Sequence, residues 1–523
     1  MGLAALVGFA VYQVHAFWSN GFDDAYITYR YADNLVAGQG LVFNSGERVE
    51  GTSTFLFTIM LAAVMAFGAE PHLWARIFGG ASFCLLVIVT YALARRLCPG
   101  PGRRTLSLGA AALVAAASPL AFYSTSGLET DLFALLLAWA LFLQIKKTRG
   151  WELSWGLVAL ARPDGAAFAA LCIGIEWVCD LVEERSLVRA SQSAAGHLLR
   201  FLAVFGPLLI FRVAYYGELL PNSVIAKSGF LAAHRGAFMA WLNYLWTGSG
   251  AMIFRRFIDV WGPVLLLVPV GIALAAGRRR ATALLAGVVA GSYVLCVWDE
   301  GDWMGRYRLL TPAIAPLAVL LVLGLRSLLI APAPIWRRLS WRGRHAVSML
   351  LSVAVIAWSF NRLYYERHYR NPYAGNDYLP PIGKSLGAVM RPTDTLATDM
   401  VGIVAYYSRM RTIDIMGLCD RHIAHNGVRF PAMGKTDHDY VASRRPTFYM
   451  FHGVGHMRHH YKDVETFASQ RQDYLVIMTP HAKRARDPGH RILTVRKDRP
   501  DLEQVRRAFE AELVDPDAFL RSW

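Results

Sequence analysis

Long apolar runs recur along the first two thirds of this chain and constrain its fold more than any other feature. A helix that crosses a bilayer needs about 20 mostly apolar residues, because a backbone in lipid must satisfy its own hydrogen bonds. Hydrophobic residues make up 55% of the chain and its mean hydropathy is +0.32, which is high for a soluble protein. We therefore predict a mainly α polytopic membrane helix bundle with eleven spans: 2–19, 73–94, 105–122, 130–146, 152–161, 166–181, 197–213, 260–276, 281–297, 309–330 and 345–362.

Two of these stretches admit a second interpretation. Residues 1–18 could be a signal peptide, but they lack a basic segment and a small-residue cleavage site, so we interpret them as a span. The stretch 152–161 is short, and merging it with 166–181 into one span is the alternative.

The net charge of +16 raises the question of nucleic-acid binding. Most arginines, however, fall in short loops between apolar runs, in groups such as Arg95-Arg96, Arg103-Arg104 and Arg278-Arg279-Arg280. Groups of this kind mark cytoplasmic loops. The sequence predicts a multi-pass protein of the bacterial inner membrane that contacts membrane lipids and no nucleic acid.

Residues 52–68 are apolar as well, but a span there would invert every later loop and place the arginine groups outside. We therefore predict that this segment is a helix lying in, or dipping into, the outer interface. The first outer loop then runs from about residue 20 to 72 and carries two helices beside the membrane.

The character of the chain changes near its last third, where Asp, His, Arg and Pro become frequent. We predict two domains: a membrane domain over 1–362 and a periplasmic α/β domain over 363–523. Expected strands of the second domain are Thr395–Thr398, Arg411–Ile415, Thr447–Phe451 and Tyr474–Met478. A histidine-rich stretch at 452–460 lacks an acidic partner at a zinc-binding spacing, so we do not predict a metal site there.

Two adjacent carboxylates, Asp23 and Asp24, follow the first apolar run and begin an amphipathic helix. Acids beside a bilayer are costly unless they have a use, and the exposed N–H groups of a helix start favour the ionised form of Asp24. Both residues could instead serve only as helix caps, although a cap needs just one of them.

Further polar residues fall in the predicted outer loops, where side chains from five loops could meet. Each has a structural alternative: a solvated loop charge, a helix cap, an ion pair at the Arg162-Pro163-Asp164-Gly165 break, a proline turn or an interfacial anchor. The candidate substrate-binding residues are Glu50, Glu129, Asp164, Asn222, Lys227, Asp302, Arg306 and Arg308.

A transferase on the outer face has no nucleotide-sugar pool and needs a donor carried by lipid. Transfer from a polyprenyl-phosphate sugar requires a carboxylate near the acceptor hydroxyl, which Asp23 or Asp24 supplies. It also requires cations or a metal at the departing phosphate. Arg306, Arg308 and Lys227 fit the first option, and a divalent cation (Mg²⁺, Mn²⁺ or Ca²⁺) at Asp23 and Asp24 is the second.

Nine motifs, in order along nearly the whole chain, carry a resemblance to a known family. The chain resembles the C-type (GT-C) superfamily of membrane glycosyltransferases and, more narrowly, the family of terminal β-(1→2) arabinofuranosyltransferases and ZomB-like proteins. The matching segments are Asp23–Ala32, Gly38–Asn44, Glu47–Ser53, Ser126–Thr130, Arg162–Gly165, Tyr216–Asn222, Gly301–Arg308, Asp399–Gly402 and Ile413–Asp420.

The resemblance implies a decaprenyl-phosphate sugar donor, a cell-envelope polysaccharide acceptor and dependence on Asp23 or Asp24. The chain departs from the family at Thr52-Ser53-Thr54-Phe55 and at Asp299-Glu300-Gly301-Asp302, and both departures bear on which sugar fits. A non-catalytic scaffold or motor-control protein that keeps a transferase frame is the alternative. A transporter would need charges near the bilayer midplane and paired half-chain repeats, which we do not find in the sequence.

Overall fold

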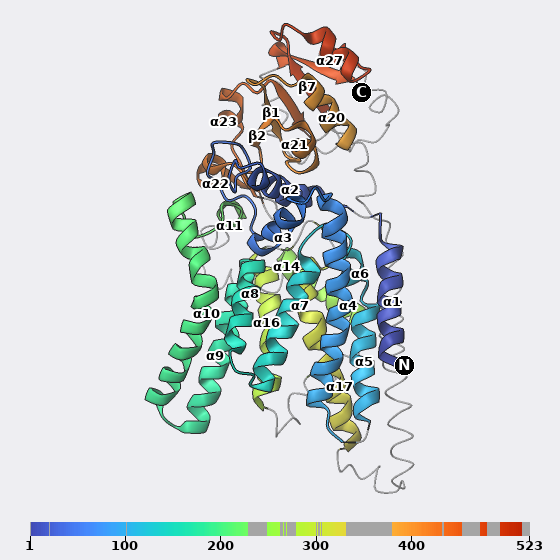
Figure 1. Cartoon of the computed structure of the whole chain (residues 1–523), viewed down its shortest axis with the longest axis vertical. Helices are drawn as coiled ribbons and strands as arrows, with labels where there is room; N and C mark the ends of the chain where they lie inside the picture. Colours follow the sequence, from blue (N-terminus) through green and yellow to red (C-terminus); the bar gives the residue numbers. More distant parts are fainter. Residues whose placement is uncertain are drawn as a thin grey trace.

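The computed structural model describes most of the chain and shows a tall layer of helices with a smaller sheet region above it (Figure 1). The described residues are 2–19, 21–100, 102–227, 248–261, 265, 268, 279–299, 301, 304, 306–330, 379–430, 434–451, 471–478 and 492–514. The predicted span 345–362, most of 260–276 and the histidine-rich stretch lie outside these residues.

The helix layer contains long apolar helices that run roughly side by side. Within the described residues, five helices are long and apolar enough to cross a membrane. The predicted multi-pass membrane protein is therefore confirmed. The helices of this layer are α1 (Gly2–Ala16), α4 (Pro71–Leu97), α5 (Arg103–Ala116), α6 (Ser118–Tyr123), α7 (Thr130–Lys146), α8 (Trp151–Ala161), α9 (Asp164–Glu184), α10 (Leu187–Tyr216), α14 (Ser249–Trp261), α16 (Arg279–Trp298) and α17 (Thr311–Ile330).

The fifth and sixth predicted spans are separate helices, α8 and α9. Pro163 ends the hydrogen-bonded run of α8, and Asp164 starts α9. A side chain at Gly165 would collide with the backbone carbonyl of Val158, so glycine allows α9 to pack directly against the last turn of α8. The break places Arg162 and Asp164 together at one end of both helices.

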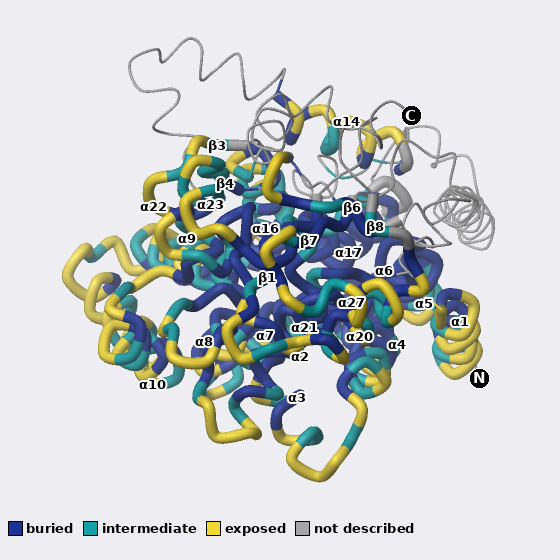
Figure 2. Tube along the Cα trace, turned by 90° about the horizontal axis from the view of Figure 1, so that it is seen from above, coloured by how far each residue is buried: buried dark blue, intermediate teal, exposed yellow. Residues whose placement is uncertain are grey.

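Apolar side chains remain exposed on the outer helices. Ile210 is 72% exposed and Leu199 69% exposed on α10, and Val11 is 55% exposed on α1. Viewed from above, α1 and α10 lie at the periphery, whereas the middle of the molecule is largely buried (Figure 2). Apolar side chains exposed to this extent on the outer helices suit contact with lipid chains.

Two helices lie between the helix layer and the sheet: α2 (Asp23–Val36) and α3 (Phe55–Met65). At about 1.5 Å per residue, the 11 residues of α3 extend only about 16 Å, which is too short for a bilayer of about 30 Å. This length fits the expected interfacial segment within 52–68.

The C-terminal region contains a mixed six-stranded sheet with the order β2-β1-β5-β7-β6-β8. β1 pairs in parallel with β2 and β5, and the remaining pairs are antiparallel. The four predicted strands are present as β1, β2, β5 and β6, which confirms the α/β character of this region. The elements are α20 (Leu379–Val389), β1 (Thr395–Thr398), α21 (Ile403–Ser408), β2 (Arg411–Asp414), α22 (Arg421–Asn426), β3 (Val428–Phe430), β4 (Gly434–Thr436), α23 (His438–Ser443), β5 (Phe448–Phe451), β6 (Tyr474–Met478), β7 (Ile492–Arg496), α27 (Leu502–Ala508) and β8 (Glu512–Val514).

Buried polar contacts join α2 to the sheet region. The Arg30 guanidinium donates to the backbone carbonyls of Ala405 and Met410, each at 2.7 Å. The Asp23 carboxylate accepts the backbone N–H groups of Gly402 at 2.9 Å and Ile403 at 2.7 Å. These contacts hold α2 against α21. A buried charge destabilises the fold unless it is hydrogen-bonded, so the folded protein must keep these contacts.

Candidate active site

A cavity of about 330 Å³ lies among α2, the segment 51–54, the starts of α9 and α11 (Asn222–Lys227), the end of α16 and the 3₁₀ turn η2 (Arg308–Leu310). Leu418, from the loop after β2, also lines it. Polar groups from widely separated segments therefore surround one space beneath the sheet region. The charged residues of its lining are Asp24, Glu129, Arg162, Asp164, Lys227, Asp299 and Arg308.

Arg162 is the centre of the ion pairs seen in this lining. Its Nε lies 2.9 Å from the Asp164 carboxylate, and its NH1 lies 3.5 Å from that of Glu129. The ring of Phe133 lies under the same guanidinium, with its centroid 5.0 Å away. A guanidinium held on several sides keeps a fixed orientation, which suits recognition of a phosphate or carboxylate.

Hydroxyl groups form a second part of the wall. Thr28 lies one helical turn after Asp24 on α2, and Thr52 and Thr54 belong to the segment that precedes α3. The three hydroxyls lie 3.2 to 3.4 Å from one another. All three residues line the cavity, as does Ser53.

The predicted site residues divide into two groups. Asp24, Glu129, Asp164, Lys227 and Arg308 line the cavity. The lining does not include Asp23, Glu50, Asn222 or Arg306. Asp302 lies outside the described residues.

Residues of the second group make structural contacts around the cavity. Buried Glu50 pairs with Arg212 on α10 at 2.9 Å, and the amide of Asn222 donates to the carbonyls of Gly417 and Leu418, both at 2.9 Å. The guanidinium of Arg306 lies over the ring of Phe122, 4.2 Å from its centroid. The contact of Glu50 ties the segment before α3 to α10, and those of Asn222 tie the start of α11 to the loop after β2.

Sequence reasoning did not select Thr28, Thr52, Thr54, Ser223 or Asp299, all of which line the cavity. The position of Thr28, four residues after Asp24 on a helix, is a signal that could have found one of them, because such residues share a helix face. No comparable signal marks Ser223 or the two threonines of the loop.

The loop after β2 covers the cavity closely. A side chain at Gly51 would collide with the Sγ of Cys419, so glycine permits this approach. Below the loop, the buried Asp414 carboxylate accepts the N–H groups of Cys419 at 2.7 Å and Met416 at 2.8 Å. Burial, with smaller contributions from the charges of Asp420 and Asp24, raises the pKa of Asp414 to about 7 against the opposing effect of these two bonds.

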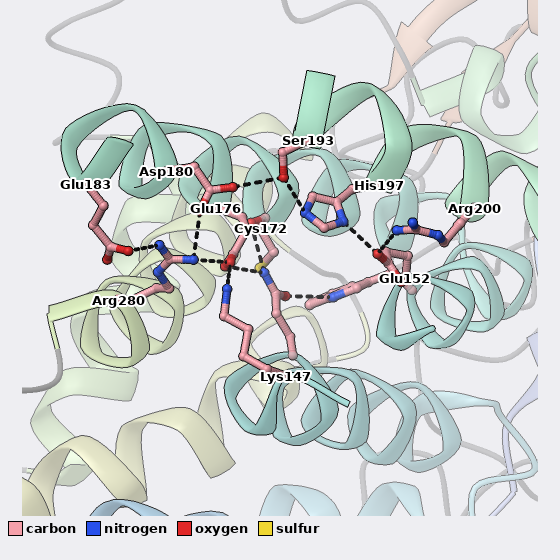
Figure 3. Close-up of polar contacts among 12 residues, drawn as sticks. Lys147, Glu152, Cys172, Glu176, Asp180, Glu183, Ser193, His197, Arg200 and Arg280 are labelled. Atoms are coloured by element: carbon pink, nitrogen blue, oxygen red, sulfur yellow. Dashed lines mark hydrogen bonds and ion pairs between the residues drawn. The ribbon is translucent and has the colours of Figure 1, made fainter. Parts of the chain in front are cut away.

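A separate ion-pair network lies at the other end of the helices, near the turn between α9 and α10 (Figure 3). Glu176 pairs there with Lys147 and Arg280, and Arg280 also pairs with Asp180 at 2.9 Å. Glu152 contacts His197 at 2.6 Å and Arg200 at 2.7 Å. Glu176 follows Asp164 by twelve residues of α9, about 18 Å along the helix, so the network is distinct from the cavity.

The described residues contain no cluster of three or more His, Cys, Asp or Glu side chains that could hold a metal ion. The Asp23 carboxylate accepts backbone N–H groups rather than pointing with Asp24 into a shared cage. Within the part of the chain described here, the cavity has cationic side chains that can bind an anionic ligand directly. Its described lining has no cluster of carboxylates that could bind such a ligand through a metal ion.

The backbone is similar to solved structures of ArnT from Cupriavidus metallidurans. The structure bound to undecaprenyl phosphate matches with a TM-score of 0.55 and 14% identity, over 94% of this chain and 97% of that chain. The structure without ligand matches with a TM-score of 0.53 over the same shares. The predicted GT-C-type fold is confirmed.

The sequence is similar to curated arabinofuranosyltransferases. The terminal β-(1→2)-arabinofuranosyltransferase of Mycobacterium tuberculosis is 32% identical over 294 residues, which are 52% of this chain and 43% of the relative. The protein of that name from Corynebacterium glutamicum is 28% identical over 354 residues, or 60% and 49%. The chain spans about half the length of these relatives. A family model described as a domain of unknown function (DUF8728) matches residues 361–487.

Proposed function

We propose that this GT-C-type protein is a membrane glycosyltransferase that moves a sugar, arabinofuranose, from a polyprenyl-phosphate donor to a cell-envelope glycan. One observation carries the proposal: a carboxylate, Asp24, and three cationic residues, Arg162, Lys227 and Arg308, line the same cavity. A sugar phosphate needs cations at its phosphate, and its acceptor needs a base.

In the proposed reaction, the oxygen of an acceptor hydroxyl attacks the anomeric carbon of the donor sugar. The bond between that carbon and the phosphate oxygen breaks, and the polyprenyl phosphate leaves with the bonding electrons. Asp24 takes the proton of the hydroxyl, while Arg308 and Lys227 offset the charge that develops on the phosphate. Arg162, oriented by Asp164 and Glu129, contributes to the same phosphate site.

The comparisons support the substrate classes of this proposal. ArnT, which shares the fold, was solved with undecaprenyl phosphate, and the curated relatives are named as arabinofuranosyltransferases. We place the cavity on the outer face of the membrane, because the arginine groups of the sequence occupy the loops at the other ends of the helices. A glycan acceptor would reach the cavity from that side.

The adjacent pair Asp23 and Asp24 provides the test. Asp24→Asn removes the base and should lower turnover about 10²- to 10⁴-fold, while the protein stays folded with only a small change in melting temperature. The assay follows transfer from polyprenyl-phosphate arabinofuranose to an arabinan acceptor by the purified protein. Full turnover by a folded Asp24→Asn variant would exclude this mechanism and favour a scaffold.

Asp23→Asn is the matched control, since the change is the same one residue away. Each carboxylate oxygen of Asp23 accepts one N–H group, from Gly402 or Ile403, so the amide loses one of these bonds and weakens the other. We expect a loss of about 2 kcal/mol in unfolding free energy, and turnover per folded molecule that stays much closer to wild type than that of Asp24→Asn. Equal losses of turnover in both variants would show that the pair acts through the stability of α2.

A further inference from the structure

We infer that the hydroxyls of Thr28, Thr52 and Thr54 form the wall that reads the donor's sugar ring and so determine which sugar the cavity accepts. The inference rests on the proposed function and deepens it. Nothing in the similarity to other proteins assigns these three residues, and we call them the threonine wall.

The threonine wall is held together by side chains that cannot move far. Thr28 Oγ1 lies 3.4 Å from that of Thr52 and 3.3 Å from that of Thr54, and the latter two are 3.2 Å apart. Each residue keeps between 4 and 7% of its surface exposed while lining the cavity. The branched Cβ restricts the first side-chain torsion of threonine, so the hydroxyls are fixed in place before a ligand arrives.

A fourth threonine behind the wall limits how its hydrogens are shared. Thr58 Oγ1 donates its hydrogen to the backbone carbonyl of Thr54 at 2.9 Å, so its contact with Thr52, at 3.4 Å, requires Thr52 as the donor. The hydrogens of Thr28, Thr52 and Thr54 must then serve four hydroxyl contacts, and at least one contact lacks a hydrogen.

This shortage makes the threonine wall adaptable to a hydroxylated ligand. A ligand hydroxyl can donate to an oxygen of the wall and supply the missing hydrogen, or it can accept one that a wall residue redirects. A sugar ring offers both donors and acceptors and carries no charge. The phosphate has stronger partners in the cationic residues Arg162, Lys227 and Arg308, so the neutral ring is the part of the donor left for the wall.

The position of the wall beside Asp24 gives it a role in selectivity. Thr28 shares the helix face of Asp24, so a ring seated on the wall lies near the base that activates the acceptor. A polar site rejects a ligand that lacks one expected hydroxyl, because a buried partner is then left without a hydrogen bond. The threonine wall should therefore discriminate against deoxy sugars.

The experiment replaces each wall hydroxyl by a methyl group of the same size: Thr28→Val, Thr52→Val and Thr54→Val. The purified full chain is assayed with polyprenyl-phosphate arabinofuranose and with its three monodeoxy forms, and kcat and KM are measured separately for each donor. We expect wild type to prefer the parent sugar at least about 10-fold over one deoxy form, since a hydrogen bond of about 1.4 kcal/mol corresponds to that factor. At least one valine variant should lose about 10-fold in kcat/KM for the parent and keep the wild-type value for that deoxy form.

Thr90→Val is the matched control. Thr90 is a buried helical threonine on α4, and its hydroxyl donates to the backbone carbonyl of Leu86, as that of Thr58 does to Thr54. It lies outside the cavity lining, so its donor preference should equal that of wild type. Thr28→Ser, Thr52→Ser and Thr54→Ser keep the hydroxyl and should keep the preference, which separates the effect of the hydroxyl from an effect on the fold.

The outcomes separate this inference from the proposed function. If wild type transfers the sugar and all three valine variants keep its preference, or lose activity equally for parent and deoxy donors, the inference is wrong and the function stands. If the wild-type chain transfers nothing from any of the four donors, the proposed function fails and the inference fails with it.

Discussion

The cavity and the ion-pair network lie at opposite ends of α9 and contain the same types of charged residue, but these residues are arranged differently. At the network, Lys147, Arg280, Glu176 and Asp180 contact one another directly and join neighbouring helices (Figure 3). At the cavity, charged residues surround a space of about 330 Å³. Charge content alone therefore does not mark a site; what distinguishes the cavity is that the backbone holds the charges around a space large enough for a ligand.

The cavity and the network should therefore respond in opposite ways when a charged residue is replaced by a neutral one. A charge that lines the cavity should matter more for the reaction than for stability, because the ligand is its partner in the reaction even where, as at Arg162, it also has protein partners. A charge in the network should matter for stability and little for the reaction, because its partners are other side chains of the protein and at least one member of each main pair, Glu176 or Glu152, is buried.

Among the cationic residues of the cavity, Arg308→Met should produce the largest effect. We expect kcat/KM to fall about 10²- to 10³-fold, as it does when a preorganised donor to developing charge is removed, with a much smaller effect on melting temperature. Transfer kinetics and thermal unfolding of the purified protein measure the two quantities. Arg306→Met is the control, since Arg306 lies over Phe122 and outside the lining. A larger kinetic loss for Arg306→Met than for Arg308→Met would contradict our choice of phosphate residue.

Glu176→Gln should show the reverse pattern at the network. The Glu176 side chain is 1% exposed and pairs with both Lys147 and Arg280, so its neutralisation leaves two cations with one partner fewer. The unfolding free energy should fall by about 2 kcal/mol, because the buried carboxylate loses its charge-assisted bonds while Lys147 is half exposed and Arg280 keeps Asp180 and Glu183 as partners. The kcat of the folded fraction should stay within about twofold of wild type. A variant of unchanged stability would mean that the network stabilises less than its burial suggests.

The sequence predicted the parts of this comparison that follow from periodicity and chemistry. Apolar runs predicted the helices, and isolated acids and bases in the outer loops predicted Asp24 and Arg308 as cavity residues. It could not predict which of two adjacent carboxylates faces the cavity. The hydrogen bonds that engage Asp23 come from Gly402 and Ile403, nearly 400 residues further along the chain. The contacts of Glu50 with Arg212 depend in the same way on packing between distant elements.

A further effect concerns the pH dependence of stability and centres on Asp414, a buried acid above the cavity. Its charged neighbours include the acids Asp420 and Asp24, whereas the acids of the network pair with cations. Burial, with smaller contributions from the charges of Asp420 and Asp24, raises the pKa of Asp414 to about 7. Between pH values of about 4 and about 7, the Asp414 carboxyl is therefore protonated in the native state. In the unfolded state, where its pKa is about 3.9, it is ionised over the same range. Since the native state holds more protons between these values, stability should fall as pH rises from about 4 to about 7.

Thermal unfolding of wild type and Asp414→Asn across this range tests the sign. The stability of wild type should decline more steeply than that of the variant, by a difference on the order of a few kcal/mol, and Asp498→Asn in an exposed turn should follow wild type. Asp24→Asn should reduce the decline, because it removes one of the charges that disfavour ionisation of Asp414. If Asp414→Asn and wild type share one slope, Asp414 is ionised throughout this range, and the acids above the cavity are not coupled as we describe.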